Sequence, residues 1–387
     1  MLSARVPGTP EQPREFATPL IAWQRTHGRH TLPWQATRDP YRVWLSEIML
    51  QQTQVATVLG YYDRFLQRFA DVAALAAASL DDVFSLWSGL GYYSRARNLH
   101  RCAQAVVAEH GGRFPPSSEA LMTLPGIGRS TAAAIAAFCF GERVAILDGN
   151  VKRVLTRVLG FDGDLAETRQ ERALWVEAIK LLPEHDIERY TQGLMDLGAT
   201  VCTQRSPSCL LCPVRAVCVA QQAGTQVRFP IKTRKLKRGT REHLWLWLQW
   251  RDEVWLVQRP ETGVWAGLWS LPEFDSAAAF EAASGGWPGQ GEHLPSFTHT
   301  LTHLDWTLHP RRWTLPARSA GAAVERITAA WPAGQWFGLD EALAAGLPAP
   351  LRKLLTPAEG RAVPPAEAST SPVVQPALPP ITPLPRR

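Results

Sequence analysis

The chain has 387 residues, which is long for a single domain and predicts two. With 45% hydrophobic and 20% charged residues it can form real cores, but no apolar run approaches the roughly 20 residues of a membrane span, and residues 1–14 lack the apolar segment of a secretory signal. These features exclude an integral membrane protein, while the net charge of +6 and the pI near 9.1 favour a polyanionic partner.

The N-terminal part predicts one buried helix with an unusual acid. Residues 1–15 are rich in proline without periodicity and are expected to be disordered, and a helix is expected over 16–23. Segment 41–50 is apolar on nearly every side, which predicts a buried helix with Glu47 in its middle. A buried glutamate is uncommon unless it is paired or functional, so a structural ion pair and a catalytic acid both remain open.

Two turns follow that could contact DNA. Gln51 and Gln52 end the first buried helix and can hydrogen-bond base edges or backbone. Residues 89–98 form a glycine turn with two tyrosines and two arginines, among them Tyr92 and Arg97. An exposed aromatic ring next to basic residues can wedge into a base stack, or it can simply cover an edge of the core.

Residues 124–131, Leu-Pro-Gly-Ile-Gly-Arg-Ser-Thr, predict a hairpin between a short helix and an alanine-rich helix over 132–140. Gly126 and Gly128 allow a turn with outward-pointing backbone N–H groups, and the second helix begins with N–H groups that lack intrahelical partners. Such a turn can bind a phosphate, although a Gly-x-Gly alone also fits an ordinary turn. Asp148, soon after the second helix, favours the functional interpretation.

Further helices are predicted over 151–159, 168–182 and 187–197, so the first 220 residues are expected to be all helical. Four cysteines follow with the spacing Cys-x6-Cys-x2-Cys-x5-Cys: Cys202, Cys209, Cys212 and Cys218. Clustered cysteines in a chain without a signal peptide indicate a metal more often than disulfides. Four thiolates fit zinc or a [4Fe–4S] cluster, and the single Cys-x2-Cys pair favours iron–sulfur.

The last third of the chain has a different composition. Residues 223–241 form a basic linker that either is solvated or follows a phosphate backbone. Alternating strands over 244–250 and 253–259 predict a hairpin, and a further strand and two helices predict an α+β domain over 242–356. Residues 357–387 are rich in Pro, Ala and Ser and are expected to be disordered.

Together these motifs resemble the MutY-type adenine DNA glycosylases of the helix–hairpin–helix superfamily, over residues 16–355. The hairpin with Asp148 matches the superfamily, the block 45–55 resembles the catalytic helix, and the cysteine spacing resembles that of the endonuclease III and adenine glycosylase branches. The resemblance implies an all-α helix–hairpin–helix glycosylase domain over 16–222, including an iron–sulfur cluster loop over 202–218, followed by an α+β Nudix-like domain.

The resemblance also implies roles for individual residues. Glu47 would protonate the adenine and ionised Asp148 would stabilise or capture the cationic sugar, with Asn150 and Ser130 supporting the sugar and phosphate. Tyr92 would intercalate and Gln52 would contact the orphan base. The implied DNA contacts are Gln51, Gln52, Tyr92, Arg97, Gly126 and Gly128. The cysteines would hold one [4Fe–4S] cluster, either structural or redox-active.

The second domain is expected to bind rather than to hydrolyse. After Pro272 it offers only Glu273, Asp275 and Glu281, without the paired glutamates of a Nudix hydrolase. Segment 297–303 resembles the lesion-reading loop of the family, whose Phe-Ser-His triplet is here Leu301, Thr302 and His303. Thr302 keeps a hydroxyl, whereas Leu301 replaces the aromatic ring.

The expected protein is a cytoplasmic bacterial monomer that excises adenine from A:8-oxoguanine or A:G mispairs in double-stranded DNA. A bifunctional glycosylase/lyase is disfavoured because Ser130 stands where that branch needs an amine nucleophile. A non-catalytic iron–sulfur DNA-binding protein would need neither Glu47 nor Asp148. A nucleotide-pool hydrolase would need the acidic box that is missing.

Overall fold

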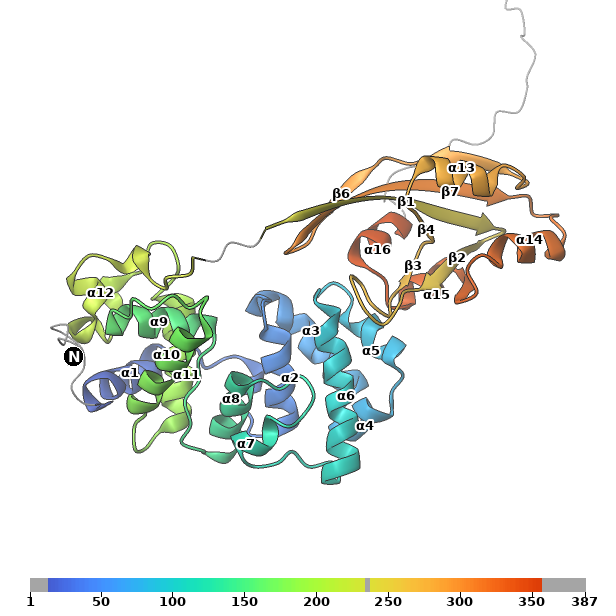
Figure 1. Ribbon diagram of the computed structural model, residues 1–387. Helices are drawn as coiled ribbons and strands as arrows, with labels where there is room; N and C mark the ends of the chain where they lie inside the picture. The colour runs from blue at the N-terminus through green and yellow to red at the C-terminus, as the bar shows by residue number, and fades with distance from the viewer. Residues whose placement is uncertain (1–12, 234–236, 357–387) are drawn as a thin grey trace, which may run out of the picture.

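The computed structural model describes residues 13–233 and 237–356, which form a helical domain joined to a domain built on a sheet (Figure 1). Residues 1–12 and 357–387, which were expected to be disordered, lie outside the described residues, as do residues 234–236 of the expected linker. The helical domain comprises α1 (Pro13–His27), η1 (Pro33–Gln35), α2 (Pro40–Leu50), α3 (Val55–Arg68), α4 (Val72–Ala77), α5 (Leu80–Trp87), α6 (Tyr93–His110), α7 (Ser118–Leu121), α8 (Arg129–Phe140), α9 (Gly149–Leu159), α10 (Thr168–Lys180), α11 (Ile187–Thr200), η2 (Cys209–Leu211), η3 (Arg215–Val217), α12 (Val219–Gln222) and η4 (Gln226–Arg228).

The helical domain has two lobes that meet along α8. One apolar cluster gathers α2 to α7, and a second gathers α1, α9, α10 and α11. Residues 132–137 of α8 are fully buried, and they divide between the two clusters. Helices of both clusters pack against α8. Its small alanine side chains allow these helices to approach closely. The N-terminal ends of α2 and α9 therefore belong to opposite lobes.

The second domain is a twisted mixed sheet with helices packed against it. The central strands β1 (Gly239–Trp250) and β7 (Leu304–Leu315) run parallel, with β2 and β5 beyond them in the order β3-β2-β1-β7-β5. The elements are β2 (Glu253–Gln258), β3 (Trp269–Ser270), β4 (Glu273–Phe274), α13 (Ala277–Ser284), β5 (Gln290–His293), β6 (Phe297–Thr300), α14 (Gly321–Thr328), β8 (Gly334–Gly338), α15 (Leu339–Ala344) and α16 (Ala349–Leu355).

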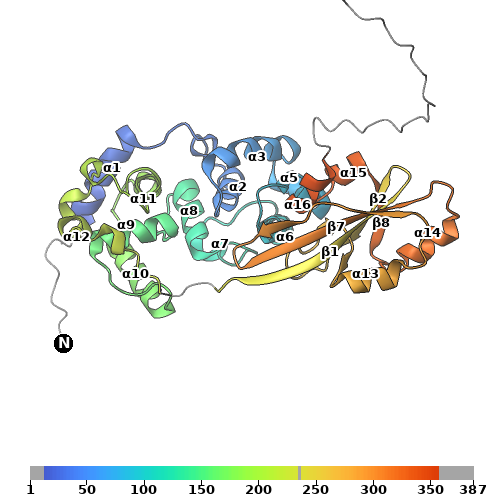
Figure 2. The same cartoon turned by 90° about the horizontal axis from the view of Figure 1, so that it is seen from above.

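The two domains are joined by a packed interface as well as by the linker (Figure 2). Phe84 of α5 lies in one apolar cluster with Leu268 and Leu347, and a side chain added at Gly346 would lie 2.6 Å from Phe84. Polar bonds fix this contact: Tyr93 Oη donates to the Leu347 carbonyl at 2.9 Å, and Arg352 Nε donates to Ser88 Oγ at 2.8 Å. The sheet domain is therefore held against α5 and α6.

Several expected boundaries are corrected. The expectation that residues 1–15 are disordered is wrong for its last residues, because α1 begins at Pro13. The linker over 223–241 is shorter than expected, because β1 begins at Gly239 and pairs with β7 from that residue on. Segment 297–303 is mostly a strand, and only residues 301–303 form the turn of the β6–β7 hairpin. The hairpin between β1 and β2 and the absence of strands from the described residues before 223 agree with the sequence.

Candidate active site and DNA interface

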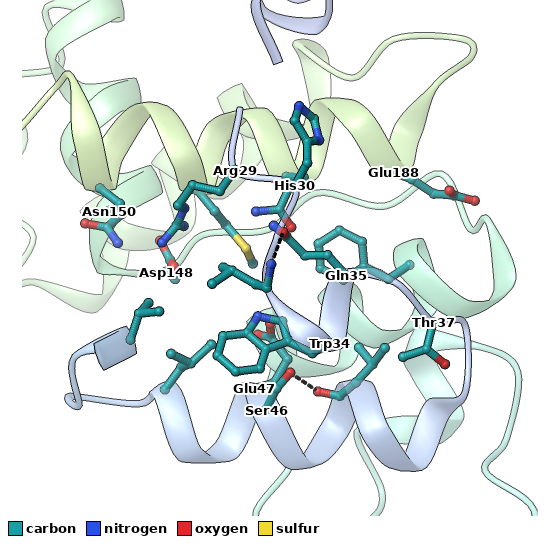
Figure 3. Close-up of a pocket in the computed structure, with 18 of the residues that line it drawn as sticks. Arg29, His30, Trp34, Gln35, Thr37, Ser46, Glu47, Asp148, Asn150 and Glu188 are labelled. Atoms are coloured by element: carbon teal, nitrogen blue, oxygen red, sulfur yellow. Dashed lines mark hydrogen bonds between the residues drawn. The ribbon is translucent and has the colours of Figure 1, made fainter. Parts of the chain in front are cut away.

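A cavity of about 690 Å³ lies where the two lobes of the helical domain meet (Figure 3). Its lining includes Glu47 from α2, and Asp148 and Asn150 from the start of α9. The segment between α1 and α2 forms another part of the wall. The fold thus brings to one pocket the two acids and the asparagine that the sequence singled out.

Glu47 is only partly buried, because its carboxyl opens on to the pocket. The rest of α2 around it is apolar and packed, since Trp44, Leu45 and Ile48 are all buried. Desolvation, and to a smaller extent the negative charge of Asp148, raise the pKa of Glu47 to about 8. Near neutral pH this carboxyl is largely protonated and can donate a proton.

Asp148 is the N-cap of α9. Its Oδ1 accepts a hydrogen bond of 2.7 Å from the Val151 N–H, which fixes the carboxyl at the N-terminus of the helix. Burial raises the pKa of Asp148, while the backbone bonds and the charges of Arg153 and Lys152 act in the opposite direction. Two acids that share a pocket but differ in their hydrogen bonds can hold different protonation states.

A chain of hydrogen bonds connects this pocket with the cysteine loop. Arg153 donates to Asn150 Oδ1 at 2.7 Å, to the Gly198 carbonyl at 2.6 Å and to the Cys202 carbonyl at 2.8 Å. Asn150 is also packed tightly, since a Cβ at Gly198 would lie 2.6 Å from its Cβ. The asparagine is therefore fixed in the pocket wall by α11 and by Arg153.

Sequence reasoning missed the part of the pocket wall contributed by residues 29–38. Arg29 lines the pocket and is fixed by Asp196, a buried aspartate of α11, through bonds of 2.7 Å and 3.0 Å. Gln35 also lines the pocket, and its buried amide nitrogen has no hydrogen-bond partner within the described parts of the chain. The sequence analysis gave these residues no role, because no periodic pattern marks them.

The hairpin between α7 and α8 uses its two glycines differently. Gly126 has a φ of +77°, and a Cβ there would lie 2.6 Å from the Cβ of Asn98. Gly128, expected to serve the turn in the same way, is the N-cap of α8 with a φ of −83° and open space around it. Ser130 Oγ accepts from the Leu147 N–H at 3.1 Å, which ties the start of α8 to the segment before Asp148.

Two of the expected DNA contacts have left-handed backbone conformations. Gln52 has a φ of +57° and Tyr92 a φ of +50°, and both side chains are exposed, Tyr92 by 45%. Their neighbour Gln51 is half-buried, and its amide donates to Thr131 Oγ1 at 3.4 Å. The structure thus leaves Gln52 exposed at the end of α2 and Tyr92 partly exposed in the loop before α6.

Arg97 is placed differently from the expectation of a free DNA contact. Its guanidinium donates to the Ala266 carbonyl of the second domain and lies over the Phe84 ring, 5.7 Å from the centroid. Burial lowers the pKa of Arg97. In this structure Arg97 therefore bonds across the interface between the two domains, and its contact with DNA stays a prediction.

The Leu301–His303 turn of the second domain reaches the helical domain. Thr302 Oγ1 lies 2.9 Å from Tyr92 Oη. Of the acids after Pro272, Glu273 pairs with Arg259 and Glu281 with Arg311, and Asp275 lies 3.4 Å from His243 Nε2. Within the described residues no group of three or more His, Cys, Asp or Glu side chains is placed to hold a metal ion. The second domain therefore shows no acidic metal box in its described part.

The four clustered cysteines line one small cavity between α9, the end of α11 and the loop up to α12. All four are free thiols, and Arg157, which is buried, donates to Cys202 Sγ at 3.3 Å. As they stand they do not form a closed metal-ligand set. Four sulfur donors around one cavity beside a buried cation have the chemistry required to hold an anionic iron–sulfur cluster.

Comparison with known proteins places the chain. An adenine DNA glycosylase of Buchnera aphidicola (subsp. Schizaphis graminum) is 33% identical over 344 residues, which cover 88% of this chain and 97% of that protein. The chain belongs to the adenine DNA glycosylase family. The human adenine DNA glycosylase is 32% identical over 89% of this chain and 74% of its own length. The HhH-GPD superfamily of base excision DNA repair proteins matches residues 45–178, and the NUDIX domain family matches 244–357.

Among solved structures, a thermostable thymine-DNA glycosylase is 29% identical and covers 55% of this chain and 97% of its own, with a TM-score of 0.49. Membership in the adenine DNA glycosylase family makes this chain a DNA-binding enzyme of base excision repair, as its motifs predicted. No helix in the described residues has the length and apolar character to cross a membrane.

Proposed function

We propose that this protein excises adenine from DNA where it is mispaired with 8-oxoguanine or guanine. The observation that carries the proposal is that Glu47, with a pKa near 8, and Asp148 face one cavity large enough for a base. Family membership supports adenine as the base that is removed. The adenine must leave the base stack to reach this cavity, at a cost of roughly a few kcal/mol.

The reaction breaks the bond between the sugar C1′ and the adenine nitrogen. Glu47 gives its proton to the adenine, so the bonding electrons leave with a neutral base. The sugar becomes an oxocarbenium-like cation, which the ionised Asp148 stabilises or captures. A water molecule then bonds to C1′, breaks any bond between C1′ and the Asp148 carboxylate, and gives its proton to Glu47, which restores the site. Asn150 and Arg29, fixed in the pocket wall, support the sugar and its phosphate.

The remaining contacts grip the DNA around the extruded base. The hairpin at Gly126 to Gly128 presents the N-terminus of α8 for a phosphate. Tyr92 fills the space left in the stack, and Gln52 meets the orphan base from the opposite side. Thr302, next to Tyr92, supplies a hydroxyl to the edge of an 8-oxoguanine, supported by its position at the tip of the β6–β7 turn. We further propose that one monomer acts on one mispair.

We propose that the enzyme has no lyase step. Lyase chemistry needs an amine that forms a Schiff base with the sugar, and Ser130 occupies the corresponding position. Its hydroxyl accepts the Leu147 N–H instead. The abasic strand should therefore remain intact.

We also propose that Cys202, Cys209, Cys212 and Cys218 hold one [4Fe–4S] cluster. Purified protein should contain about four iron atoms per chain, and Cys212→Ser should lose them. The matched control is Cys139→Ser, because Cys139 lies in α8, away from the four ligands. Stoichiometric zinc without iron in anaerobically purified protein would contradict the cluster type, and iron retained in the Cys212 variant would contradict the ligand set.

The test of the function is a duplex with a single A:8-oxoguanine pair. Free adenine should appear in single turnover, and the strand should break only after alkali treatment. Borohydride should trap no protein–DNA adduct through an amine. Glu47→Gln should bind the duplex but release adenine about 10²- to 10⁴-fold more slowly. Release of another base from matched duplexes, or full activity of the Glu47 variant, contradicts the proposal.

A further inference from the structure

Arg95 is a buried arginine between the catalytic helix and the loop that carries Tyr92. It lies in the first turn of α6 and is only 8% exposed, so it cannot contact a DNA backbone in this conformation. Neither the sequence motifs nor the proposed chemistry gives it a role. Burial lowers its pKa to about 10, so the guanidinium remains charged at neutral pH.

One half of the guanidinium closes the C-terminal end of α2. Nη1 donates to the Ile48 carbonyl at 2.8 Å and to the Met49 carbonyl at 2.9 Å. The last carbonyls of a helix lack intrahelical partners, and a cation there also interacts favourably with the helix dipole. These carbonyls belong to the two residues that directly follow Glu47. The arginine thus fixes the end of the helix that carries the proposed acid.

The other half fixes two loops at once. Nη2 donates to Thr53 Oγ1 at 3.1 Å, next to Gln52, and to the carbonyls of Leu90 and Gly91 at 3.3 Å and 3.2 Å, next to Tyr92. The guanidinium also lies over the Tyr92 ring, 5.6 Å from its centroid. One side chain therefore bridges the segments that hold the two exposed DNA contacts.

Both residues held in this way are in the left-handed region without being glycine. Such conformations persist only where the surroundings determine them, and they occur often at functional sites. Arg95 supplies such surroundings, because it bonds to Thr53, next to Gln52, and to Leu90 and Gly91, which precede Tyr92. All these partners are neutral, so it is the forked geometry of the guanidinium, rather than an ion pair, that makes the bridge.

We propose that Arg95 is a positioning residue that sets Gln52 and Tyr92 relative to each other and to Glu47, and so couples contact with the orphan base to extrusion of the adenine. The inference rests on the proposed function for what is extruded, and on the hydrogen bonds alone for the bridge. The substrate is the same mispaired duplex. The inference adds one residue, Arg95, that fixes the positions of Gln52, Tyr92 and Glu47 relative to one another.

The test compares Arg95→Met, which keeps the length but removes the fork, and Arg95→Lys, which keeps the charge. Arg101→Met is the matched control, because Arg101 is an exposed residue of the same helix. Rates are taken in single turnover and corrected for the active fraction. Arg95→Met should slow adenine release by about a hundredfold, as expected for a misplaced site, while duplex affinity changes little. The rate of Arg95→Lys should lie between those of the wild type and Arg95→Met. This variant keeps the test valid if Arg95→Met does not fold.

A purely structural role is separated by a double-mutant cycle with Tyr92→Ala. Because part of the Arg95 effect passes through Tyr92 and part through α2, Arg95→Met should slow the Tyr92→Ala enzyme by clearly less than it slows the wild type, whereas independent effects would add in full. Additive losses, or a corrected rate equal to wild type in both Arg95 variants, overturn the proposal.

A fluorescent analogue, 2-aminopurine at the adenine position, gives a readout that does not depend on excision. Its emission should rise on binding to the wild type and rise less with Arg95→Met. An equal rise in both overturns the positioning role. If the wild type extrudes the analogue but releases no adenine, the proposed function fails while the positioning role is still decided.

Discussion

The Tyr92 hydroxyl lies 2.9 Å from the Thr302 hydroxyl, although the two residues come from different domains. This bond joins the loop before α6 to the β6–β7 turn. It brings the residue proposed to enter the base stack next to the residue proposed to read the lesion. Tyr93, Arg97 and Arg352 fix the two domains to each other close by, so the structure keeps these two groups adjacent.

Thr302→Ala should lower the preference for A:8-oxoguanine over A:G. A hydroxyl bonded to a base edge discriminates by about 1–3 kcal/mol, which is roughly 5- to 150-fold in relative rate. The measurement is the ratio of single-turnover rates on the two mispairs. Tyr92→Phe is the matched control, because it removes the partner hydroxyl and keeps the ring. If both variants lose the same preference, the bond between the domains, rather than the lesion, is the source of the effect.

Gly126→Ala should damage the hairpin, whereas Gly128→Ala should not destabilise it. Alanine at 126 combines a φ of +77° with a contact of 2.6 Å to the Asn98 Cβ, so the free energy of unfolding should fall by more than about 1 kcal/mol. Gly128 has an ordinary φ and open space. Urea unfolding and duplex affinity check both variants. Equal stability of the two would show that the turn tolerates a side chain at 126.

The helices that hold the proposed catalytic residues could be predicted from the sequence, because their apolar patterns and caps depend on neighbouring residues alone. Glu47 was recognisable as an acid on an apolar helix, and Asp148 as the residue before a new helix. The placement of Arg29 was not predictable, since it depends on Asp196, which is 167 residues away in the chain. The interdomain bond of Arg97 was not predictable for a similar reason: its acceptor, the Ala266 carbonyl, lies in the other domain. Likewise, Arg95 owes its importance to carbonyls, which no side-chain motif records.

Glu47→Gln should stabilise the protein above neutral pH while it removes activity. The pKa of Glu47 rises from 4.5 to about 8 on folding, so the folded state resists its ionisation. The penalty is absent below pH 4.5, grows as pH rises and is complete above about pH 8, where it amounts to a few kcal/mol. Chemical unfolding of both proteins at pH 5 and pH 8.5 measures it. A gain in stability that does not increase with pH would contradict a Glu47 carboxyl that desolvation keeps protonated.

The rate of adenine release should fall on both sides of neutral pH. Glu47 must be protonated to give its proton to the base, so the rate should fall as pH rises through about 8. Asp148 must be ionised to stabilise the sugar, and since burial raises its pKa, the acidic limb should lie above the usual range of an aspartate. Each acid influences the other, so the two limbs report the pair.

Single-turnover rates from pH 5 to pH 10, with duplex binding measured at every pH, give the profile. A rate that stays constant from pH 7 to pH 10 would exclude Glu47 as the proton donor, because its carboxyl is ionised over the upper part of that range.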